Sequence, residues 1–506
     1  MATLGSRIRD YEIWGRIGQG GMSEVWLAKH TVLNVPVIIK TLRPDIAAST
    51  GSTMISTTDD EAIARVINEA RLMARVTSSR VVRAIDAGVH EGTPYLVQEY
   101  VDGIDLAELD RRRRGALGVG LPLWFVSHVM KEICQALHTA HQAGVIHRDV
   151  KPSNVFGAPE TGIRLGDFGI AVAHEERKRY DTSGTIMFSA PEQLLGREVD
   201  RYTDVYGAGA TACDLRYGHP PFRTLEAILD RSGQPTFPVP QTPAEAYFQH
   251  LLRRMLAKDP ADRPDDPDEP GRHFATLARA LRPGTMRAPV TCIDRHTFRV
   301  GGCLITLAVG DIAQAKADGI VSSANYEMKM RVGVGQALRA RGGDAIEEEA
   351  MKHGEQPLGT CIATGAGKLD ARNVLHAVSA WNEASCVGRA MHRALLLSDE
   401  HGNRSLAFPA LGTGAARVSL EMCATAMMSS LGWHLALGGT RLENVKVLLG
   451  DEAKLKTFRE VAEEALRDHD TAPPFIDLGL AVTEGEVRGD ATTYVDAASQ
   501  PRIVPQ

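Results

Sequence analysis

The stretch His147–Val155 reads HRDVKPSNV, and soon after it Gly166–Gly169 reads GDFG. Two carboxylates, an ammonium and an amide therefore fall within one short span: Asp149, Lys151, Asn154 and Asp167. Burying so many charged groups in a structural core is unfavourable. Carboxylate and amide oxygens are ligands for divalent ions, and an ammonium neutralises phosphate oxygens. The span therefore indicates a site that holds metal ions and a polyphosphate.

The bulk composition describes a multidomain protein without a bias toward nucleic acid. The chain has 506 residues, too many for one hydrophobic core, which favours two or three domains. Its 57 Lys and Arg against 63 Asp and Glu give a net charge of −6, so we expect no specific nucleic-acid partner. Seven cysteines without a C-x-x-C pair indicate free thiols. Signal-peptide and membrane-spanning patterns are absent from the sequence, so we expect a cytoplasmic protein without a membrane partner.

Composition and periodicity divide the chain into successive regions. Short β-branched runs predict strands from residue 10 to about 100, and helices dominate from residue 121 to about 280. Apolar residues recur every four positions at Phe125, Val129, Ile133 and Leu137, as on the buried face of a helix. After residue 290, strands and helices alternate as in α/β domains. We predict an N-terminal extension (1–9), a first domain (10–282), a linker (283–292), a second domain (293–470) and a disordered tail (471–506).

Three features upstream of the opening span also suit a phosphate ligand. Gly18–Val25 (GQGGMSEV) lies between two predicted strands, and its glycines let backbone N–H groups approach phosphates. Lys40 ends the predicted strand VPVIIK, where its ammonium can reach phosphate oxygens. Glu69, on a following predicted helix, can pair with Lys40 and hold it in place.

The opening span supplies the remaining groups that phosphoryl transfer needs. Asp149 can orient a hydroxyl and accept its proton, and Lys151 can neutralise charge on the transferring group. Asn154 and Asp167 offer oxygen ligands to Mg²⁺. Phosphoryl transfer depends mainly on positioning and on stabilisation of charge, and these residues provide both.

This ordered set of motifs resembles the Ser/Thr protein kinases, in particular the eukaryotic-like kinases of bacteria. Over residues 10–280 the set also includes Ala190–Glu192 (APE), Asp204 and Arg263, which is implied to pair with Glu192. The resemblance implies a bilobal α+β kinase fold that uses ATP with Mg²⁺, or with Mn²⁺ in its place, to phosphorylate Ser or Thr of proteins. The implied catalytic residues are Asp149, Lys151, Lys40 and Glu69, and the implied metal ligands are Asn154 and Asp167. The implied ATP-binding residues are Ile17, Gly18, Gly20, Val25, Lys40, Glu99, Val101, Asn154 and Asp167.

Two positions depart from the usual kinase pattern. Ile38 stands where a small Ala normally lies against adenine, and Gln98 occupies the gatekeeper position, so we expect a tighter or altered adenine slot. These departures keep open the alternative of a non-catalytic, nucleotide-sensing scaffold. Arg148, before the catalytic Asp, is typical of kinases that loop phosphorylation controls. The candidate phosphorylation sites are Thr182 and Ser183.

The second domain has two Gly-containing loops of its own. The sequence MKMRVGVGQALRA leads a Gly-containing loop into a predicted helix, which presents N–H groups to an anion. Later, LAFPALGTGAARVSLE reads as a strand, a Gly-rich turn and a helix. Two such loops at strand ends imply a ligand with two phosphates at the carboxyl edge of a sheet. Tight turns that merely require Gly are the alternative.

Together these motifs resemble a macro domain, the ADP-ribose-binding module, over about residues 300–466. The resemblance implies an α/β three-layer fold. Asp311 is implied to bond the adenine amino group with Ile312 beside it, and Asn325 is implied to contact the distal ribose. The two phosphate loops are implied to contain Gly333, Val334, Gly412, Thr413, Gly414 and Ala415.

The macro resemblance also bears on catalysis in the second domain. Gly335 stands where many hydrolytic macro domains carry an Asp, so a carboxylate that could activate water is missing from that place. We therefore favour a reader of ADP-ribose or ADP-ribosylated protein over an ADP-ribosyl hydrolase. The whole sequence predicts an ATP-dependent Ser/Thr kinase whose macro domain targets or regulates phosphorylation. The alternatives are a pseudokinase–reader scaffold and a kinase–hydrolase.

Two charged features receive no functional role. The basic run Arg111–Arg114 is interpreted as a solvated helix end or loop rather than a nucleic-acid or substrate-docking patch. His138 and His141 lie near the end of a predicted helix without the Glu of an HExxH motif, so we expect no zinc site there.

Overall fold

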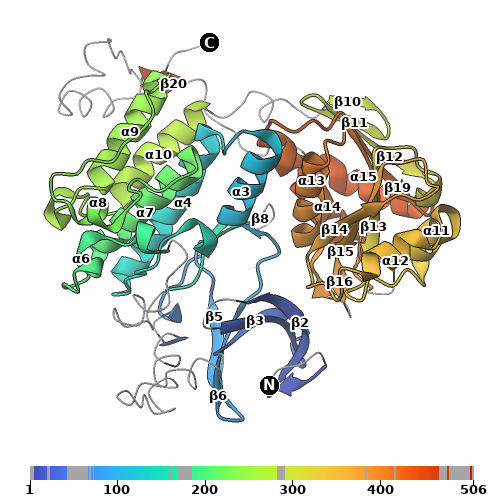
Figure 1. Cartoon of the computed structure of the whole chain (residues 1–506), viewed down its shortest axis with the longest axis horizontal. Coiled ribbons are helices and arrows are strands. Elements are labelled where there is room, and N and C mark those ends of the chain that lie inside the picture. Colours follow the sequence, from blue (N-terminus) through green and yellow to red (C-terminus); the bar gives the residue numbers. More distant parts are fainter. Residues whose placement is uncertain are drawn as a thin grey trace.

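The computed structural model describes residues 5–19, 23–42, 67, 70–71, 73–158, 162–168, 185–281, 291–381, 384–414, 417–466, 476–477 and 502–503. Figure 1 shows a small sheet domain in blue, a helical domain in cyan and green, and an α/β domain in yellow to red. Residues 283–290 of the predicted linker and most of the predicted tail lie outside the described residues, whereas Thr291 and Cys292, also predicted as linker, belong to strand β10. No helix within the described residues is long and apolar enough to cross a membrane.

An antiparallel six-stranded sheet forms the first part of the chain, as the β-branched runs predict. Its order is β1-β2-β3-β4-β6-β5. The strands are β1 (Arg7–Ile8), β2 (Tyr11–Gln19), β3 (Ser23–His30), β4 (Pro36–Leu42), β5 (Ala84–His90) and β6 (Thr93–Glu99). One face of the sheet carries a core of its own, which includes Ile13, Val37, Ile39 and Val97. The other face therefore remains for a ligand or for a neighbouring domain.

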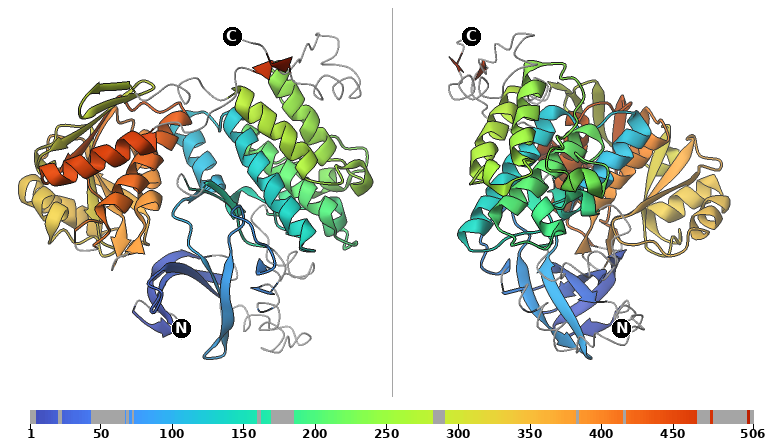
Figure 2. Two further views of the ribbon diagram at one scale, coloured as in Figure 1. Left: turned by 180° about the vertical axis from the view of Figure 1, so that it is seen from behind. Right: turned by 60° about the vertical axis from the view of Figure 1, so that its left-hand side comes forward.

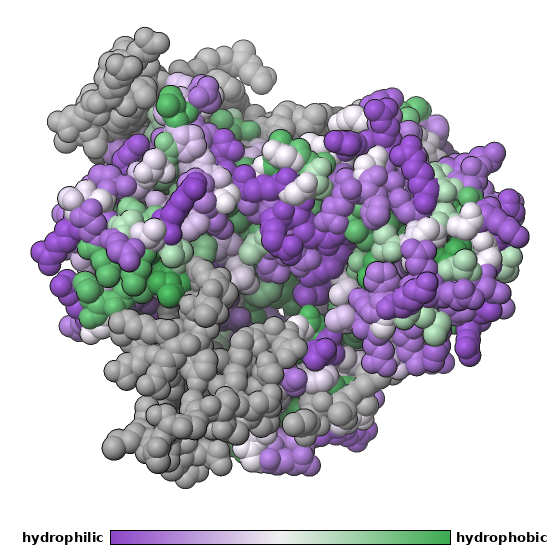
Figure 3. All heavy atoms as spheres, viewed as in Figure 1, coloured by the Kyte–Doolittle hydropathy of each residue, from purple (hydrophilic) through white to green (hydrophobic). Residues whose placement is uncertain are grey.

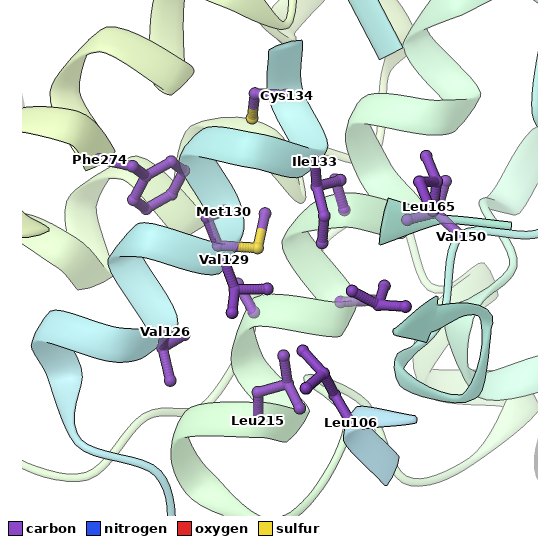
Figure 4. Packing of buried hydrophobic residues seen from close by; sticks show 14 of the residues in the cluster. Leu106, Val126, Val129, Met130, Ile133, Cys134, Val150, Leu165, Leu215 and Phe274 are labelled. Carbon is purple, nitrogen blue, oxygen red and sulfur yellow. The ribbon is translucent and has the colours of Figure 1, made fainter. Parts of the chain in front are cut away.

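Helices dominate the second part of the chain. They are α3 (Leu106–Leu117), α4 (Leu123–Gln142), α6 (Pro191–Leu194), α7 (Arg201–Tyr217), α8 (Leu225–Leu229), α9 (Pro243–Met255) and α10 (Asp268–Leu281). The predicted stripe of α4 is confirmed, because Phe125, Val129, Ile133 and Leu137 are fully buried. Figure 4 shows this face of α4 against Phe274, Leu165 and Leu215, which come from three other elements.

Short elements between these helices position the loop that holds the polar span. They are β7 (Ile104–Asp105), the 3-10 turn η1 (Pro152–Asn154), β8 (Val155–Ala158), β9 (Gly162–Leu165) and the 3-10 turn η2 (Thr185–Phe188). β8 pairs with both β7 and β9 in an antiparallel arrangement. This small sheet connects the loop before β8 with the stretch after β9.

The last part of the chain is a sheet of eight strands between two helical layers. Its strands, in spatial order, are β10 (Thr291–Asp294), β11 (Thr297–Val300), β12 (Cys303–Val309), β19 (Asn444–Leu449), β18 (Ser405–Pro409), β13 (Gly319–Ala324), β15 (Asn373–Val378) and β14 (Cys361–Gly365). The strands from β12 to β15 are mutually parallel. Helices α13 (Val387–Glu400), α14 (Leu420–Ala436) and α15 (Glu452–Leu466) pack on one face, and α11 (Gly333–Gly342) and α12 (Ala345–Met351) pack on the other.

The α/β domain is docked against the helical domain. Helix α3 lies beside α13 in Figure 1, and both views of Figure 2 place it between the two domains. Leu396 and Leu437 of the α/β domain belong to the hydrophobic core of the helical domain. Trp433 of α14 meets Phe125 edge to face, with ring centroids 5.2 Å apart. The two domains therefore share apolar packing.

Candidate functional site

The polar side chains of the HRD stretch converge at the turn η1. Asn154 is buried, and its Nδ2 donates to the backbone oxygen of Asp149 at 2.8 Å and to its Oδ2 at 3.0 Å. Lys151 Nζ lies 3.0 Å from the same Asp149 oxygen. Because the amide nitrogen of Asn154 is engaged, its Oδ1 is the atom left to face a cation. The structure thus brings Asp149, Lys151 and Asn154 together.

A buried carboxylate on α7 holds the backbone of this loop. Asp204 is 1% exposed and accepts from the N–H of His147 at 2.8 Å and of Arg148 at 2.7 Å. The same carboxylate lies 2.8 Å from His141 Nε2. Arg148 has φ +66°, a left-handed conformation that residues other than Gly seldom adopt. Asp204 therefore holds the loop before Asp149 in a strained conformation.

His147 connects this loop to the GDFG stretch. Its Nε2 lies 2.9 Å from the backbone oxygen of Gly166, and its ring packs against Phe168 in a tilted arrangement with ring centroids 4.3 Å apart. The Gly166 N–H in turn donates to the backbone oxygen of Asn154 at 2.9 Å. Burial lowers the pKa of His147, so the ring is neutral at physiological pH. The loop and the GDFG stretch are therefore held together by hydrogen bonds through the buried interior.

Asp167 forms an ion pair with Lys40 of β4. Desolvation alone would raise the pKa of Asp167, but the positive charge and hydrogen bond of Lys40 outweigh it and bring the pKa below its ordinary value. The side chain of Asp167 is still 37% exposed. The carboxylate is therefore ionised and accessible to a ligand.

Sheet register places the predicted Gly-rich loop beside Lys40. Gly18 of β2 pairs with Val25 of β3, and Val25 pairs with Lys40 of β4. Ile17 packs with Val25 against a common hydrophobic cluster. The described residues at the two ends of the loop therefore lie on the same sheet as Lys40, the partner of Asp167.

The predicted ATP-binding residues Glu99 and Val101 bound the hinge, the segment Glu99–Val101 that begins at the last residue of β6. Glu99 ends this strand and forms ion pairs with Arg83 at 2.9 Å and with Arg164 at 3.3 Å. The backbone oxygen of Val101 accepts from the Gly103 N–H at 2.9 Å. The hinge is thus joined to both the sheet domain and the helical domain.

Five predicted site residues lie outside the described residues, so their roles stay predictions. They are Gly20, Glu69, Thr182, Ser183 and Ala415.

The pair predicted between Arg263 and Glu192 is present and buried. Arg263 Nη1 and Nη2 contact the two oxygens of Glu192 at 2.6 and 3.0 Å, and the Thr203 hydroxyl donates to the same carboxylate at 2.9 Å. Glu192 lies in the APE stretch at the start of α6. The ion pair therefore anchors the chain directly after the turn η2.

The residues implied to bind ADP-ribose follow parallel strands of the same sheet. Asp311 follows β12 and Asn325 follows β13, and the carboxyl ends of these strands share one edge of the sheet. Asp311 caps the turn Ile312–Gln314, with its Oδ1 accepting from the Ala313 N–H at 2.9 Å. The carboxamide of Asn325 bonds both the N–H and the backbone oxygen of Lys329, each at 3.1 Å. Both side chains therefore stabilise their own loops.

The two predicted phosphate loops lie at this same edge. Gly333, with φ +55°, begins α11, and among the described residues no side chain caps the first turn of this helix. Its first N–H groups can therefore receive an anion. After β18, the Gly412 N–H donates to Ser323 Oγ of β13 at 3.1 Å. The remaining predicted residues on this edge are the buried Ile312, the half-buried Val334, Thr413, and the exposed Gly414.

The interpretation of the basic run as a solvated segment is wrong. Arg111 is exposed, whereas Arg113 is 1% exposed and donates to the backbone oxygens of Leu437 at 3.2 Å and Gly438 at 2.8 Å. Arg112 forms a bidentate contact with Glu400 of α13, at 2.7 and 3.1 Å. The run lies where α3 meets the α/β domain, so it forms an interface within the chain.

Sequence reasoning also missed the residue that follows the hinge. The carboxylate of Asp102 accepts from the N–H groups of Gly388 at 2.9 Å and Arg389 at 2.8 Å, at the start of α13. Tyr100 of the hinge donates its hydroxyl to the same carboxylate at 2.9 Å. An acidic residue after a hinge carries no linear signal for such a contact, because its partners lie almost three hundred positions away in the chain.

Comparison with known proteins agrees with both halves of this description. The protein kinase domain model matches residues 11–269, and the macro domain model matches residues 321–427. Serine/threonine-protein kinase PknF of Mycobacterium tuberculosis is 33% identical over 271 residues, covering 51% of this chain and 54% of that protein. Serine/threonine-protein kinase PknB of the same species is 32% identical over 332 residues, covering 62% of this chain and 49% of that protein. The chain thus spans about half the length of these curated relatives.

A crystal structure of the Mycobacterium tuberculosis PknI kinase domain is 30% identical, and the match covers 55% of this chain and 99% of that one with a TM-score of 0.44. The kinase model alone accounts for just over half of the present sequence. This chain belongs to the protein kinase family and carries a macro domain after its kinase domain.

Proposed function

We propose that the chain is a Ser/Thr protein kinase that transfers the terminal phosphate of ATP to a protein hydroxyl. The observation that carries this proposal is the connection between the catalytic loop and the GDFG stretch. Asn154 bonds the side chain of Asp149, while its backbone oxygen accepts the N–H of Gly166, the residue before Asp167. Phosphoryl transfer requires acidic, amide and cationic groups held in fixed positions, and this arrangement supports it.

The donor set of the site suits Mg²⁺. Asn154 Oδ1 and the Asp167 carboxylate are hard oxygen ligands, and the lowered pKa of Asp167 keeps its carboxylate ionised. When bound, the ion would neutralise charge on the phosphate oxygens. Mn²⁺, which also accepts carboxylate and carbonyl oxygens, would fit the same ligands.

The remaining residues have roles at stated atoms. Asp149 would accept the proton of the attacking hydroxyl at its carboxylate, which Asn154 orients. Lys151, 3.0 Å from Asp149, would place its ammonium beside the transferring phosphate. Lys40, which pairs with Asp167 here, would contact the phosphates from β4.

The surface around the APE stretch supports a protein as phosphate acceptor. Leu195 and Leu225 are 47% and 39% exposed at the ends of α6 and α8. Figure 3 shows apolar surface (green) at the lower left, where these helices lie in Figure 1. A peptide segment could bury such surface while presenting its hydroxyl. Phosphorylation at Thr182 or Ser183, with Arg148 as the phosphate partner, stays part of this proposal.

The second domain supports binding of ADP-ribose or an ADP-ribosylated protein. Asp311, Asn325 and the start of α11 lie at one edge of the sheet, where a dinucleotide would find polar and N–H groups. A β-carbon at Gly335 would lie 3.1 Å from the Cα of Met330. An acidic side chain is therefore sterically disfavoured at this position, which supports a reader over a hydrolase.

A scaffold without catalysis is the second candidate, and one observation favours it. Ile38, at the position that normally lies against adenine, is buried, with 9% of its surface exposed. The gatekeeper Gln98 is 2% exposed and its Nε2 contacts Met73 Sδ at 3.6 Å. Transfer of γ-labelled phosphate to a generic basic protein, compared between the wild type and Asp149→Asn, separates the candidates. Equal labelling would support the scaffold, and calorimetry with ADP-ribose tests the reader function separately.

A further inference from the structure

The macro domain contacts the hinge and both lobes of the kinase domain. On the sheet domain, a β-carbon at Gly15 would lie 3.2 Å from Leu358 of the macro domain. At the hinge, Asp102 caps the start of α13. On the helical domain, Arg113 bonds backbone oxygens that follow α14. The macro domain therefore holds the two lobes in one relative position.

The sheet register identifies which face of the kinase sheet the macro domain meets. Lys40 points to the phosphate site, because it pairs with Asp167. Ile38, two residues earlier on β4, lies on the same face, and it pairs in register with Leu27 of β3. Val37 and Ile39 point to the opposite face and belong to the separate core of the sheet. Ile38 and Leu27 therefore face the nucleotide side.

Macro-domain residues cover this nucleotide side. Ile38 and Leu27 share one buried cluster with Met328, Leu358 and other residues of the macro domain. The predicted ATP-binding residues Ile17 and Val25, and Tyr100 of the hinge, pack against the same cluster. The burial of Ile38 follows from this packing. The adenine end of the kinase site is therefore bounded by the macro domain.

The macro-domain loop that reaches this cluster also contains the residue implied to bind ribose. Met328 is 1% exposed and has φ +59°, a strained conformation for a side chain of its size. Asn325 closes the loop by bonding both backbone groups of Lys329. The Gln356 N–H donates to the Tyr326 oxygen at 2.8 Å and adds a second tie. A ribose that engages the Asn325 carboxamide would have to displace its bonds to Lys329.

We propose that the segment Asn325–Lys329 couples the two ligand sites. ADP-ribose would take the Asn325 carboxamide, release the strained Met328 from the cluster around Ile38, and raise the affinity of the kinase domain for ATP. This inference rests on the proposed binding of ADP-ribose by the macro domain. Because coupling of binding sites is reciprocal, ATP would raise the affinity for ADP-ribose by the same factor.

The first experiment measures binding in the full chain. The affinity for the Mg²⁺ complex of AMP-PNP, a non-hydrolysable ATP analogue, is determined by calorimetry with and without saturating ADP-ribose. We expect binding about fivefold tighter or more with ADP-ribose, and the same factor in the reverse titration. ADP-ribose that binds without changing AMP-PNP affinity, or that weakens it, overturns the coupling and leaves the reader function standing. Absence of ADP-ribose binding overturns both.

The second experiment tests the position of Met328 without relying on ADP-ribose. Met328→Ala should bind AMP-PNP more tightly than the wild type, by about the factor that ADP-ribose produces in the wild type. Met330→Ala is the matched control, because Met330 is also buried, at 3% exposed, but belongs to an internal cluster of the macro domain. We expect wild-type AMP-PNP affinity in Met330→Ala. Unchanged affinity in a folded Met328→Ala, or an equal gain in Met330→Ala, would overturn the proposal.

Discussion

The kinase site and the macro site differ in what their key polar groups do before any ligand binds. In the kinase site, buried groups from other elements hold the loop: Asp204 binds the backbone before Asp149, and His147 binds the GDFG stretch. In the macro site, Asp311 and Asn325 bond the backbone of their own short loops. The kinase site is therefore preorganised, whereas a ligand that engaged Asp311 and Asn325 would have to replace internal hydrogen bonds. This difference indicates that the catalytic loop of the kinase domain keeps its conformation when a ligand binds. The loops of Asp311 and Asn325 would change theirs.

The largest effect is expected from removing a charge of the preorganised site. Asp167→Asn should reduce phosphoryl transfer by about 10³-fold, because the Mg²⁺ ligand and the partner of Lys40 are both lost. The measurement is the initial rate of phosphate transfer from ATP at saturating Mg²⁺. Asp262→Asn, on the exposed turn before Arg263, is the control and should keep the wild-type rate. Activity within tenfold of wild type in Asp167→Asn would contradict the assignment.

The stability of the kinase domain should depend strongly on the buried ion pair of Arg263 with Glu192, which anchors the APE stretch. Glu192→Gln should lower the free energy of unfolding of the kinase domain by about 3 kcal/mol, because the guanidinium of Arg263 is left buried without its counter-charge. Urea denaturation of the full chain measures this change, and the free energy is taken from the unfolding transition that occurs at the lowest urea concentration. Glu198→Gln, on the exposed stretch before α7, should change stability by less than about 0.5 kcal/mol. Equal stability of both variants would show that the pair is no anchor.

The contact between the kinase domain and the macro domain can be weakened by a substitution in α3. Arg113→Ala should lower the free energy of unfolding by about 2 kcal/mol, because two backbone oxygens lose their donor and a cavity forms. Arg111→Ala removes the same side chain from an exposed position of the same helix and should have little effect. Limited proteolysis should separate the domains faster in Arg113→Ala. Indistinguishable behaviour of the two variants would indicate that the domains are held by other contacts.

The smallest effect is expected at the macro site. Asp311→Ala should weaken ADP-ribose binding about tenfold, because one hydrogen bond to the base is lost and the cap of the following turn is removed. Calorimetry of the full chain measures this affinity. Asp370→Ala, 65% exposed and paired only loosely with Lys316, should bind like the wild type. A wild-type affinity in Asp311→Ala would remove this residue from the site.

Local sequence was sufficient to predict elements of each domain and the family to which the chain belongs. The strand-rich start, the stripe of α4 and the pair of Arg263 with Glu192 all depend on short patterns or on family motifs, and the structure confirms them. The placement of Asp149, Lys151 and Asn154 in one loop follows from their closeness in sequence. Patterns of this kind depend on residues close together in the chain, so they predict local structure.

The contacts between the domains could not be predicted in this way. Arg112 and Arg113 look like a solvated basic run, because their partners Glu400, Leu437 and Gly438 lie about three hundred positions further along. The same holds for Met328, whose apolar character fits an internal core equally well. The sequence does not predict whether an apolar side chain packs in the core of its own domain or against a neighbouring domain. The relation of one folded domain to another depends on their complementary shapes.

The most direct test of the central claim is phosphate transfer by the full chain. The wild type is incubated with Mg²⁺ and γ-labelled ATP with a generic basic protein, and the labelled residues are identified by phosphopeptide mapping. The claim predicts label on Ser or Thr in the wild type and a loss of about 10³-fold in Asp149→Asn, which removes the proton acceptor but keeps the size of the side chain. Equal labelling by the two proteins, or none by the wild type, would contradict it.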